Sequence, residues 1–211
     1  MWSIPKVWSE AWIIGGGPSI REQFDVPDGE DPAPYMEAIH NRHIIGVNMA
    51  YRLGNWVDMM FFGDMTFLHK GYKEDMLEFP GTKVTSNSGW KRQKPWVKAR
   101  VKYVPRDMRK RVGISEKPGH LSWNNSSGAS AINLAYHMGA RKIYLLGFDM
   151  HAPGASHWHT LYGKKKVPFH RHLAAFPKIQ QDALRLGVEI INISPTSKIK
   201  AFEKATLKEV I

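Results

Sequence analysis

The sequence predicts an α/β fold in which helices cover both faces of a mostly parallel sheet. Short apolar segments rich in β-branched and aromatic residues alternate along the chain with segments of helical character. This alternation is typical of strand–helix–strand units, whose crossover connections make the strands parallel. The segment 11–14 is wholly apolar and 143–146 nearly so, as strands covered on both faces are. We therefore expect one Rossmann-like domain over residues 1–211.

The expected elements follow one another with short connections. Strands are predicted over 11–14, 43–48, 57–62, 82–86, 101–104, 142–146 and 188–193. Helices are predicted after Pro18 and over 34–41, 128–138, 172–186 and 198–210. Gly139 and Gly187 directly follow two of these helices, where glycine is the usual C-terminal cap. No repeat or linker divides the chain, so we expect a single domain.

Composition excludes several classes of protein. The chain has no cysteine, which rules out disulfides, zinc–thiolate sites, iron–sulfur clusters and thiol nucleophiles. No apolar run approaches the roughly 20 residues of a membrane span. The first residues also lack the basic and apolar regions of a secretory signal. The expected compartment is the cytoplasm.

The charge balance favours an anionic partner. Thirty Lys and Arg face 19 acids, for a formal net charge of +11. Such an excess suits nucleotides, pyrophosphate, nucleic acid or an acidic glycan, although a general solubility charge is the alternative. Within 91–111 the basic residues alternate with Trp96 and Tyr103, as in grooves for single-stranded nucleic acid. No RNA-binding or helix-turn-helix signature accompanies this stretch.

A glycine-rich turn follows the first predicted strand. Gly15, Gly16 and Gly17 allow backbone N–H groups to approach a phosphate, and Pro18 and Ser19 open the next helix. The turn is not a Walker A loop, because no Gly-Lys-Ser/Thr follows it, and it lacks the third glycine of the dinucleotide pattern. A phosphate cradle and a plain tight packing turn both remain open here.

A second candidate cradle begins the helix predicted over 128–138. Ser126, Ser127 and Gly128 offer hydroxyls and unpaired N–H groups at a helix start, although an ordinary cap has the same composition. Three further polar residues, Asn48, Asp64 and Asp149, each follow a predicted strand. Ligands of parallel sheets bind at the carboxyl ends of the strands, where these groups converge. Asp64 and Asp149 are also candidate magnesium ligands, and Asp149 a candidate ribose ligand.

Histidines crowd the segment before the helix predicted over 172–186. They are His151, His157, His159, His170 and His172. Such a group suits a general base, because imidazole titrates near neutrality, while His157 and His159 alone form a weak metal pair. The run 164–166 is all lysine and is either a lid over phosphates or a solvated charge run.

The motifs together resemble the bacterial family-42 sialyltransferases and the related hydroxymethylpterin pyrophosphokinase-like (DUF115) domains. Residues 14–20 are similar to their Gly-x-Gly-Pro-Ser-Leu opening. Residues 126–149 repeat their block of Ser-Gly, helix, Gly-aliphatic, strand and Gly-aliphatic-Asp. Residues 193–197 resemble the sialyltransferase ending, and Asn48 matches an Asn that contacts nucleotide there. Residues 65–120 carry little of the likeness.

The resemblance implies a nucleotide site and a catalytic base. The site would be lined by Gly15, Gly17, Ser19, Asn48, Ser127, Gly128 and Asp149. In the sialyltransferases it holds a CMP-sugar without a required metal, so no cofactor is expected. A histidine before the penultimate helix is their general base, which His170 matches best, with His172 in reserve. Their block continues as Asp-aromatic-Tyr, and its tyrosines assist the departing phosphate; here that role is vacant or falls to Tyr162, His157 or a lysine.

The leading interpretation is a nucleotide-dependent transferase, most closely a glycosyltransferase with a CMP-sugar-type donor and a His general base. Two alternatives stay open. One is a magnesium-dependent ATP pyrophosphokinase with Asp64 or Asp149 at the metal. The other is a catalytically silent nucleic-acid-binding module.

Overall fold

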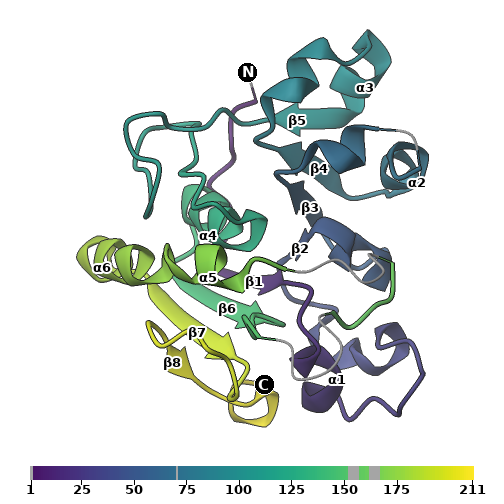
Figure 1. Ribbon diagram of the computed structural model, residues 1–211, viewed down its shortest axis with the longest axis vertical. Coiled ribbons are helices and arrows are strands. Elements are labelled where there is room, and N and C mark those ends of the chain that lie inside the picture. The colour runs from purple at the N-terminus through teal and green to yellow at the C-terminus, as the bar shows by residue number, and fades with distance from the viewer. Residues whose placement is uncertain (1, 70, 152–156, 162–166) are drawn as a thin grey trace.

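The computed structural model, which describes residues 2–69, 71–151, 157–161 and 167–211, contains one eight-stranded sheet with all neighbouring strands parallel. The strands are β1 (Glu10–Ile14), β2 (Ile44–Val47), β3 (Met59–Phe62), β4 (Thr82–Thr85), β5 (Val101–Tyr103), β6 (Lys142–Leu146), β7 (Glu189–Ile193) and β8 (Glu203–Lys204). Their order is β5-β4-β3-β2-β1-β6-β7-β8 (Figure 1). The predicted α/β fold class is confirmed.

Helices flank this sheet. The α-helices are α1 (Ser19–Gln23), α2 (Lys73–Glu78), α3 (Pro95–Arg100), α4 (Ser127–His137), α5 (Phe169–Leu173) and α6 (Phe176–Leu186). The 3-10 helices are η1 (Ala33–Tyr35), η2 (Glu37–Ile39), η3 (Asn48–Leu53), η4 (Met65–Leu68), η5 (Ser88–Arg92) and η6 (Leu207–Glu209). The longest, α4 and α6, have 11 residues each. No helix in the described ranges has the length and apolar character needed to cross a membrane.

Two hydrophobic cores lie on opposite faces of the sheet, because successive side chains of a strand point to opposite sides. In β1, Ile13 packs into the core that includes Leu134 of α4 and Ile179 of α6. Its neighbours Trp12 and Ile14 belong to the other core, together with residues of α1, η3 and α2. Because helices cover both faces of the sheet, the side chains of its central strands are buried on both sides.

The C-terminal segment corrects one prediction. Instead of the helix predicted over 198–210, Glu203 and Lys204 pair with β7, and only Leu207–Glu209 is helical. The Nζ of Lys204 donates to the backbone oxygen of Ser197 at 2.6 Å. The backbone of β7 is a hydrogen-bonding partner that a local pattern does not contain, and pairing with it outweighs helix propensity.

Two other predicted helices are divided. The one predicted over 172–186 forms α5 and α6, because Pro177 lacks an N–H and begins a new helix. The helix predicted over 34–41 is a pair of 3-10 turns, η1 and η2.

The strand order reverses direction between β1 and β6. From β1 the chain adds β2 to β5 on one side, and from β6 it adds β7 and β8 on the other. Such a reversal leaves a crevice outside the carboxyl ends of the two central strands, and ligands of open α/β sheets bind there. The glycine turn after β1 and the segment after β6, residues 147–149, both lie at this point.

Candidate functional site

The glycine turn packs directly on the end of β6. The N–H of Gly17 donates to the oxygen of Gly147 at 2.8 Å. A Cβ on Gly15 would lie 2.7 Å from that same oxygen, and one on Gly17 would lie 1.6 Å from Oδ2 of Asp149. Real Cβ contacts are never this short, so the packing of the turn requires glycine at both positions.

Asp149 joins this turn to the C-terminal half of the sheet. Its side chain is buried, and the hydroxyl of Ser19 donates to Oδ2 at 3.0 Å. Ser19 Oγ also lies 2.8 Å from Ser194 Oγ, after β7. Burial raises the pKa of Asp149, and the hydrogen bond from Ser19 opposes that rise. Asp149 thus contributes to the pocket wall while its carboxylate holds the first turn of α1 in place.

The N-terminus of α4 forms the second wall. Oγ of Ser126 accepts the N–H of Ala129 at 3.4 Å, as an N-cap, and Oγ of Ser127 accepts the N–H of Gly63 at 3.2 Å. A Cβ on Gly128 would lie 2.9 Å from the Phe148 ring. The positive end of an 11-residue helix therefore faces the crevice, which favours an anionic group there.

Asn48, directly after β2, has an unsatisfied amide. Its φ of 55° lies in the left-handed region, which Asn tolerates better than most residues. Its Oδ1 is buried without a hydrogen-bond partner in the described part of the chain. An unpaired buried acceptor costs about 1–3 kcal/mol, so a donor group on a ligand would stabilise this arrangement.

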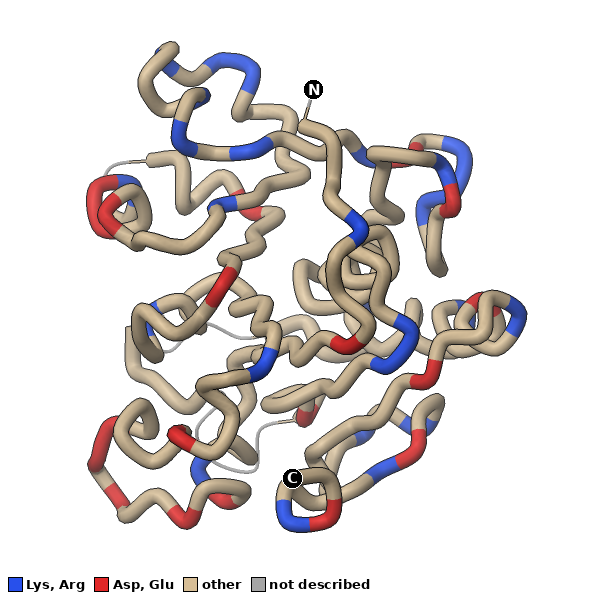
Figure 2. The backbone as a smooth tube through the Cα atoms, turned by 180° about the vertical axis from the view of Figure 1, so that it is seen from behind, with Lys and Arg blue, Asp and Glu red and all other residues tan. Residues whose placement is uncertain are grey.

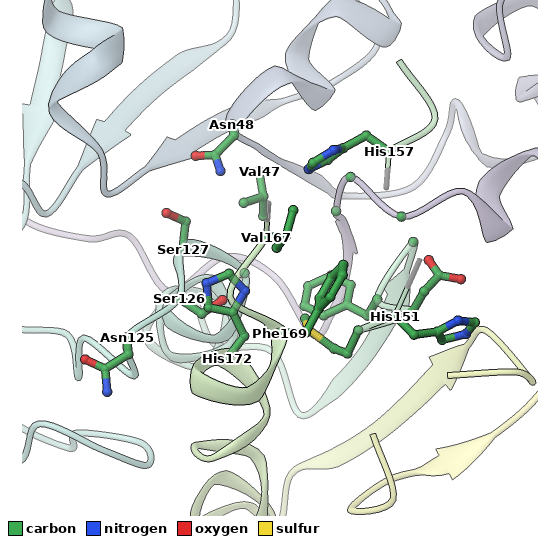
Figure 3. Close-up of a pocket in the computed structure, with 18 of the residues that line it drawn as sticks. Val47, Asn48, Asn125, Ser126, Ser127, His151, His157, Val167, Phe169 and His172 are labelled. Carbon is green, nitrogen blue, oxygen red and sulfur yellow. The ribbon is translucent and has the colours of Figure 1, made fainter. Parts of the chain in front are cut away.

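These walls enclose one pocket (Figure 3). Nine of the predicted nucleotide-binding residues line it: Gly15, Gly16, Gly17, Asn48, Asp64, Ser126, Ser127, Gly128 and Asp149. Figure 3 shows Asn48, Ser127 and His172 on one side of the pocket, with His157 and His151 across from them. Pro18 and Ser19 do not line it. The hydroxyl of Ser19 instead forms hydrogen bonds with the side chains of Asp149 and Ser194.

The two candidate bases differ in position. His172 lines the pocket and is half-buried, whereas His170 is exposed and is not among the lining residues. Burial lowers the pKa of His172, the nearby Asp64 carboxylate raises it, and His170 lowers it. The net direction is downward, which keeps the imidazole neutral and able to accept a proton near neutral pH.

The segment 157–161 covers the glycine turn. The backbone N–H of Trp158 donates to the oxygen of Gly16 at 2.9 Å, and its indole N–H donates to the oxygen of Gly15 at 3.2 Å. The rings of His157 and His159 stack at 5.2 Å. Burial lowers the pKa of His157. Burial also lowers the pKa of His159, and the nearby charges of His157 and Arg52 lower it further, to about 4.

The two predicted magnesium ligands, Asp64 and Asp149, both line the pocket. Asp64 is exposed at the pocket rim, and the Asp149 carboxylate is already bound by Ser19. Within the described ranges, no three His, Asp or Glu side chains come together as a metal site would require. Tyr162 and the lysines 164–166, suggested above as partners of a phosphate, lie outside the described residues.

Several residues of the site carry no sequence signal that would have identified them. Trp123 and Phe169 line the pocket, and Trp158 holds the turn from 143 positions away. An aromatic residue in a loop is as common in packing as in a site, and only the fold brings these rings to the glycine turn. The clustering of His and aromatic residues over 150–169 was the one available indication.

Comparison with known proteins supports the same fold. No family model and no curated protein matches the sequence. The sialyltransferase CstII from Campylobacter jejuni is similar in structure: its complex with cytidine-5'-monophosphate has a TM-score of 0.58 at 14% identity, covering 94% of this chain and 85% of that one. Its complex with CMP-3FNeuAc has a TM-score of 0.58 at 17% identity, covering 94% and 86%.

A structure of the sialyltransferase CST-II with a trisaccharide acceptor and CMP is also similar. It has a TM-score of 0.56 at 15% identity and covers 92% of this chain and 84% of that chain. At these identities the likeness establishes a sialyltransferase-like fold. The predicted likeness to the DUF115 domains stays a prediction.

Proposed function

We propose that this protein is a metal-independent glycosyltransferase that uses a CMP-sugar donor, with His172 as its general base. The observation that carries the proposal is the pocket at the reversal of strand order. It combines a glycine turn, a helix N-terminus, an unsatisfied Asn48 and a half-buried histidine. The fold that it shares with CstII, solved with CMP and with CMP-3FNeuAc, favours a cytidine donor.

The donor side of the pocket suits a nucleoside monophosphate ester. The N-terminus of α4 and the backbone of the turn offer N–H groups and a positive dipole to the phosphate. Asn48 Oδ1 can accept a hydrogen bond from a base amine or a ribose hydroxyl. The N–H groups and the helix dipole bind the phosphate more tightly as its negative charge develops, while Asn48 holds the nucleoside.

The reaction then needs only a proton acceptor. His172 takes the proton of the acceptor hydroxyl, and that oxygen attacks the anomeric carbon of the donor sugar. The bond from that carbon to the phosphate oxygen breaks, and CMP leaves with the electron pair. A pKa of His172 below the ordinary histidine value keeps the base unprotonated at the start of this step.

The assignment of the base is tested by release of CMP from CMP-sialic acid, with chelator present. The wild-type protein is expected to release CMP, and His172→Gln to lower turnover about 100- to 10,000-fold, the usual contribution of a general base. CMP binding should persist in this variant. His170→Gln is the matched control, since His170 lies on the exposed surface, and it should keep wild-type turnover.

The opposite pattern would reject the base assignment. If His170→Gln lost turnover while His172→Gln kept it, the base would be His170, as the family resemblance first implied. If only ATP with magnesium were consumed, the pyrophosphokinase interpretation would replace the glycosyltransferase.

A further inference from the structure

A basic groove lies at the β5 edge of the sheet, apart from the pocket described above. Three aromatic residues and three lysines dominate its lining: Trp2, Trp90, Tyr103, Lys91, Lys98 and Lys102. They come from the N-terminal segment, η5, α3 and β5. The groove therefore exists only because the fold brings the chain's start beside its edge strand.

Stacked rings hold two of the lysines in place. Trp90 and Tyr103 stack with centroids 5.1 Å apart and an interplanar angle of 8°. The Nζ of Lys98 lies 5.7 Å from the Trp90 centroid, and that of Lys91 lies 5.7 Å from the Tyr103 centroid. Trp90 is itself fixed by a 2.8 Å hydrogen bond to the oxygen of Val101. The ammonium groups are thus positioned before any ligand arrives.

The segment that supplies the groove lysines is strongly basic. Residues 88–111 include ten Lys and Arg and one acid, Asp107. Asp107 is buried and accepts hydrogen bonds from Ser115 and from backbone N–H groups. Within the described residues no acid forms an ion pair with any of the three groove lysines. Figure 2 shows the blue segments of η5, α3 and β5 gathered at the end of the molecule beside the N-terminus.

The lining discriminates between two kinds of polyanion. An acidic glycan presents many hydroxyl groups, which proteins usually bind through Asp, Glu, Asn or Gln oxygens. None of these residue types is found among the described residues that line the groove. A phosphodiester backbone needs cations alone, which the three lysines of the lining supply.

We propose that this groove binds single-stranded nucleic acid, with Lys91, Lys98 and Lys102 contacting its phosphates. The proposal does not depend on the glycosyltransferase assignment. Arg106 extends the basic surface toward the pocket. Its guanidinium lies 3.6 Å from the ring centroid of Trp123, a pocket residue, and donates to the oxygen of Gly63 at 3.2 Å. A strand in the groove would therefore run toward the pocket rim.

Edge protection is the competing explanation. Lysines on an outer strand prevent sheets from pairing with one another, and this accounts for Lys102 in β5. It does not account for Lys91 and Lys98, which belong to η5 and α3 and are held over ring faces. Binding measurements separate the two explanations.

The test is fluorescence anisotropy with a labelled oligothymidylate over a range of salt concentrations. The wild-type protein is expected to bind with a clear salt dependence. Lys91→Ala/Lys98→Ala/Lys102→Ala should bind at least about tenfold more weakly, with a log–log salt slope reduced by about 2, for three lost phosphate contacts. The matched control removes Lys142, Lys200 and Lys208, which are in β6 and the C-terminal segment, and should keep the wild-type affinity and slope.

Three results would overturn the proposal: no binding by the wild type, equal weakening in both triple variants, or equally tight binding of the carboxylated glycan hyaluronate. A thermal unfolding midpoint like that of the wild type shows that the groove variant is folded. Stabilisation by CMP, measured on the same variant, reports on the glycosyltransferase assignment separately.

Discussion

At the scale of single residues, the glycine turn is specified by its neighbours as much as by a ligand. Gly17 lies where a Cβ would collide with the buried Asp149 carboxylate, while the Cβ of Gly16 would meet only the ring of His157, at 2.7 Å. A side chain can move away from such a contact more easily than a carboxylate bonded to Ser19 can. The same sequence motif therefore contains positions of unequal structural importance.

Gly17→Ala should accordingly lower the free energy of unfolding by about 1–3 kcal/mol, the usual cost of overpacking a tight site. For a chain of this size that corresponds to a fall in Tm of a few degrees per kcal/mol. Gly16→Ala is the comparison variant and should cost less. Urea unfolding of both variants measures this, and a Gly17→Ala protein as stable as the wild type would refute the packing argument.

Residue patterns predicted the glycine, serine and aspartate residues of the site better than they predicted its histidine. Gly15, Ser127 and Asp149 follow or begin regular elements at the carboxyl edge of the sheet, so their convergence could be predicted from strand order alone. The choice between His170 and His172 could not. They are two positions apart in α5, and only the packing of that helix decides which imidazole enters the pocket.

At the scale of elements, Trp158 ties the segment 157–161 to the glycine turn through two hydrogen bonds, and the histidines of this segment make it sensitive to acid. The pKa of His159 is about 4 in the folded protein, below its ordinary value of 6.5. The folded state therefore resists protonation of this ring. The neutral His159 ring makes its full contribution to the free energy of unfolding above pH 6.5. That contribution is lost as the pH falls from 6.5 toward 4.

Urea unfolding at about pH 7 and about pH 5 tests this dependence. The wild-type protein should be less stable at the lower pH, and His159→Gln should lose less stability than the wild type over the same interval. His157 and His172, whose pKa values are also lowered, leave part of the effect in place. His170→Gln, on the exposed surface, should behave like the wild type. An equal loss in His159→Gln and the wild type would contradict the prediction.

Helices and strands were predicted well where burial of their side chains determines the structure. They were predicted poorly where pairing with another strand determines it. The strands β1, β6 and β7 are mostly apolar and buried after their first residue, and the structure contains all three. The C-terminal segment was predicted as a helix, yet pairing along β7 makes Glu203 and Lys204 a strand. Information about that pairing lies in the partner strand, beyond the reach of a local pattern.

At the scale of the whole molecule, the sheet separates two chemical surfaces. The candidate pocket lies at the reversal of strand order, between β1 and β6, and the basic groove lies four strands away along the sheet at β5. The net charge of +11 indicated an anionic partner without indicating which surface would bind it. We propose that the compact polar pocket binds a nucleotide and that the cationic edge binds a polymer.

The central claim is that the pocket binds a cytidine nucleotide without metal. Its most direct test is thermal unfolding of the wild-type protein with CMP, CDP, UDP, ATP and GTP, each with magnesium and with chelator. A ligand present at about 100 times its Kd stabilises the native state by about 2.7 kcal/mol, which raises Tm by roughly 5–10 °C for a chain of this size. We predict that CMP gives the largest rise and that chelator does not diminish it. A rise with ATP alone that requires magnesium, or no rise with any nucleotide, would contradict the claim.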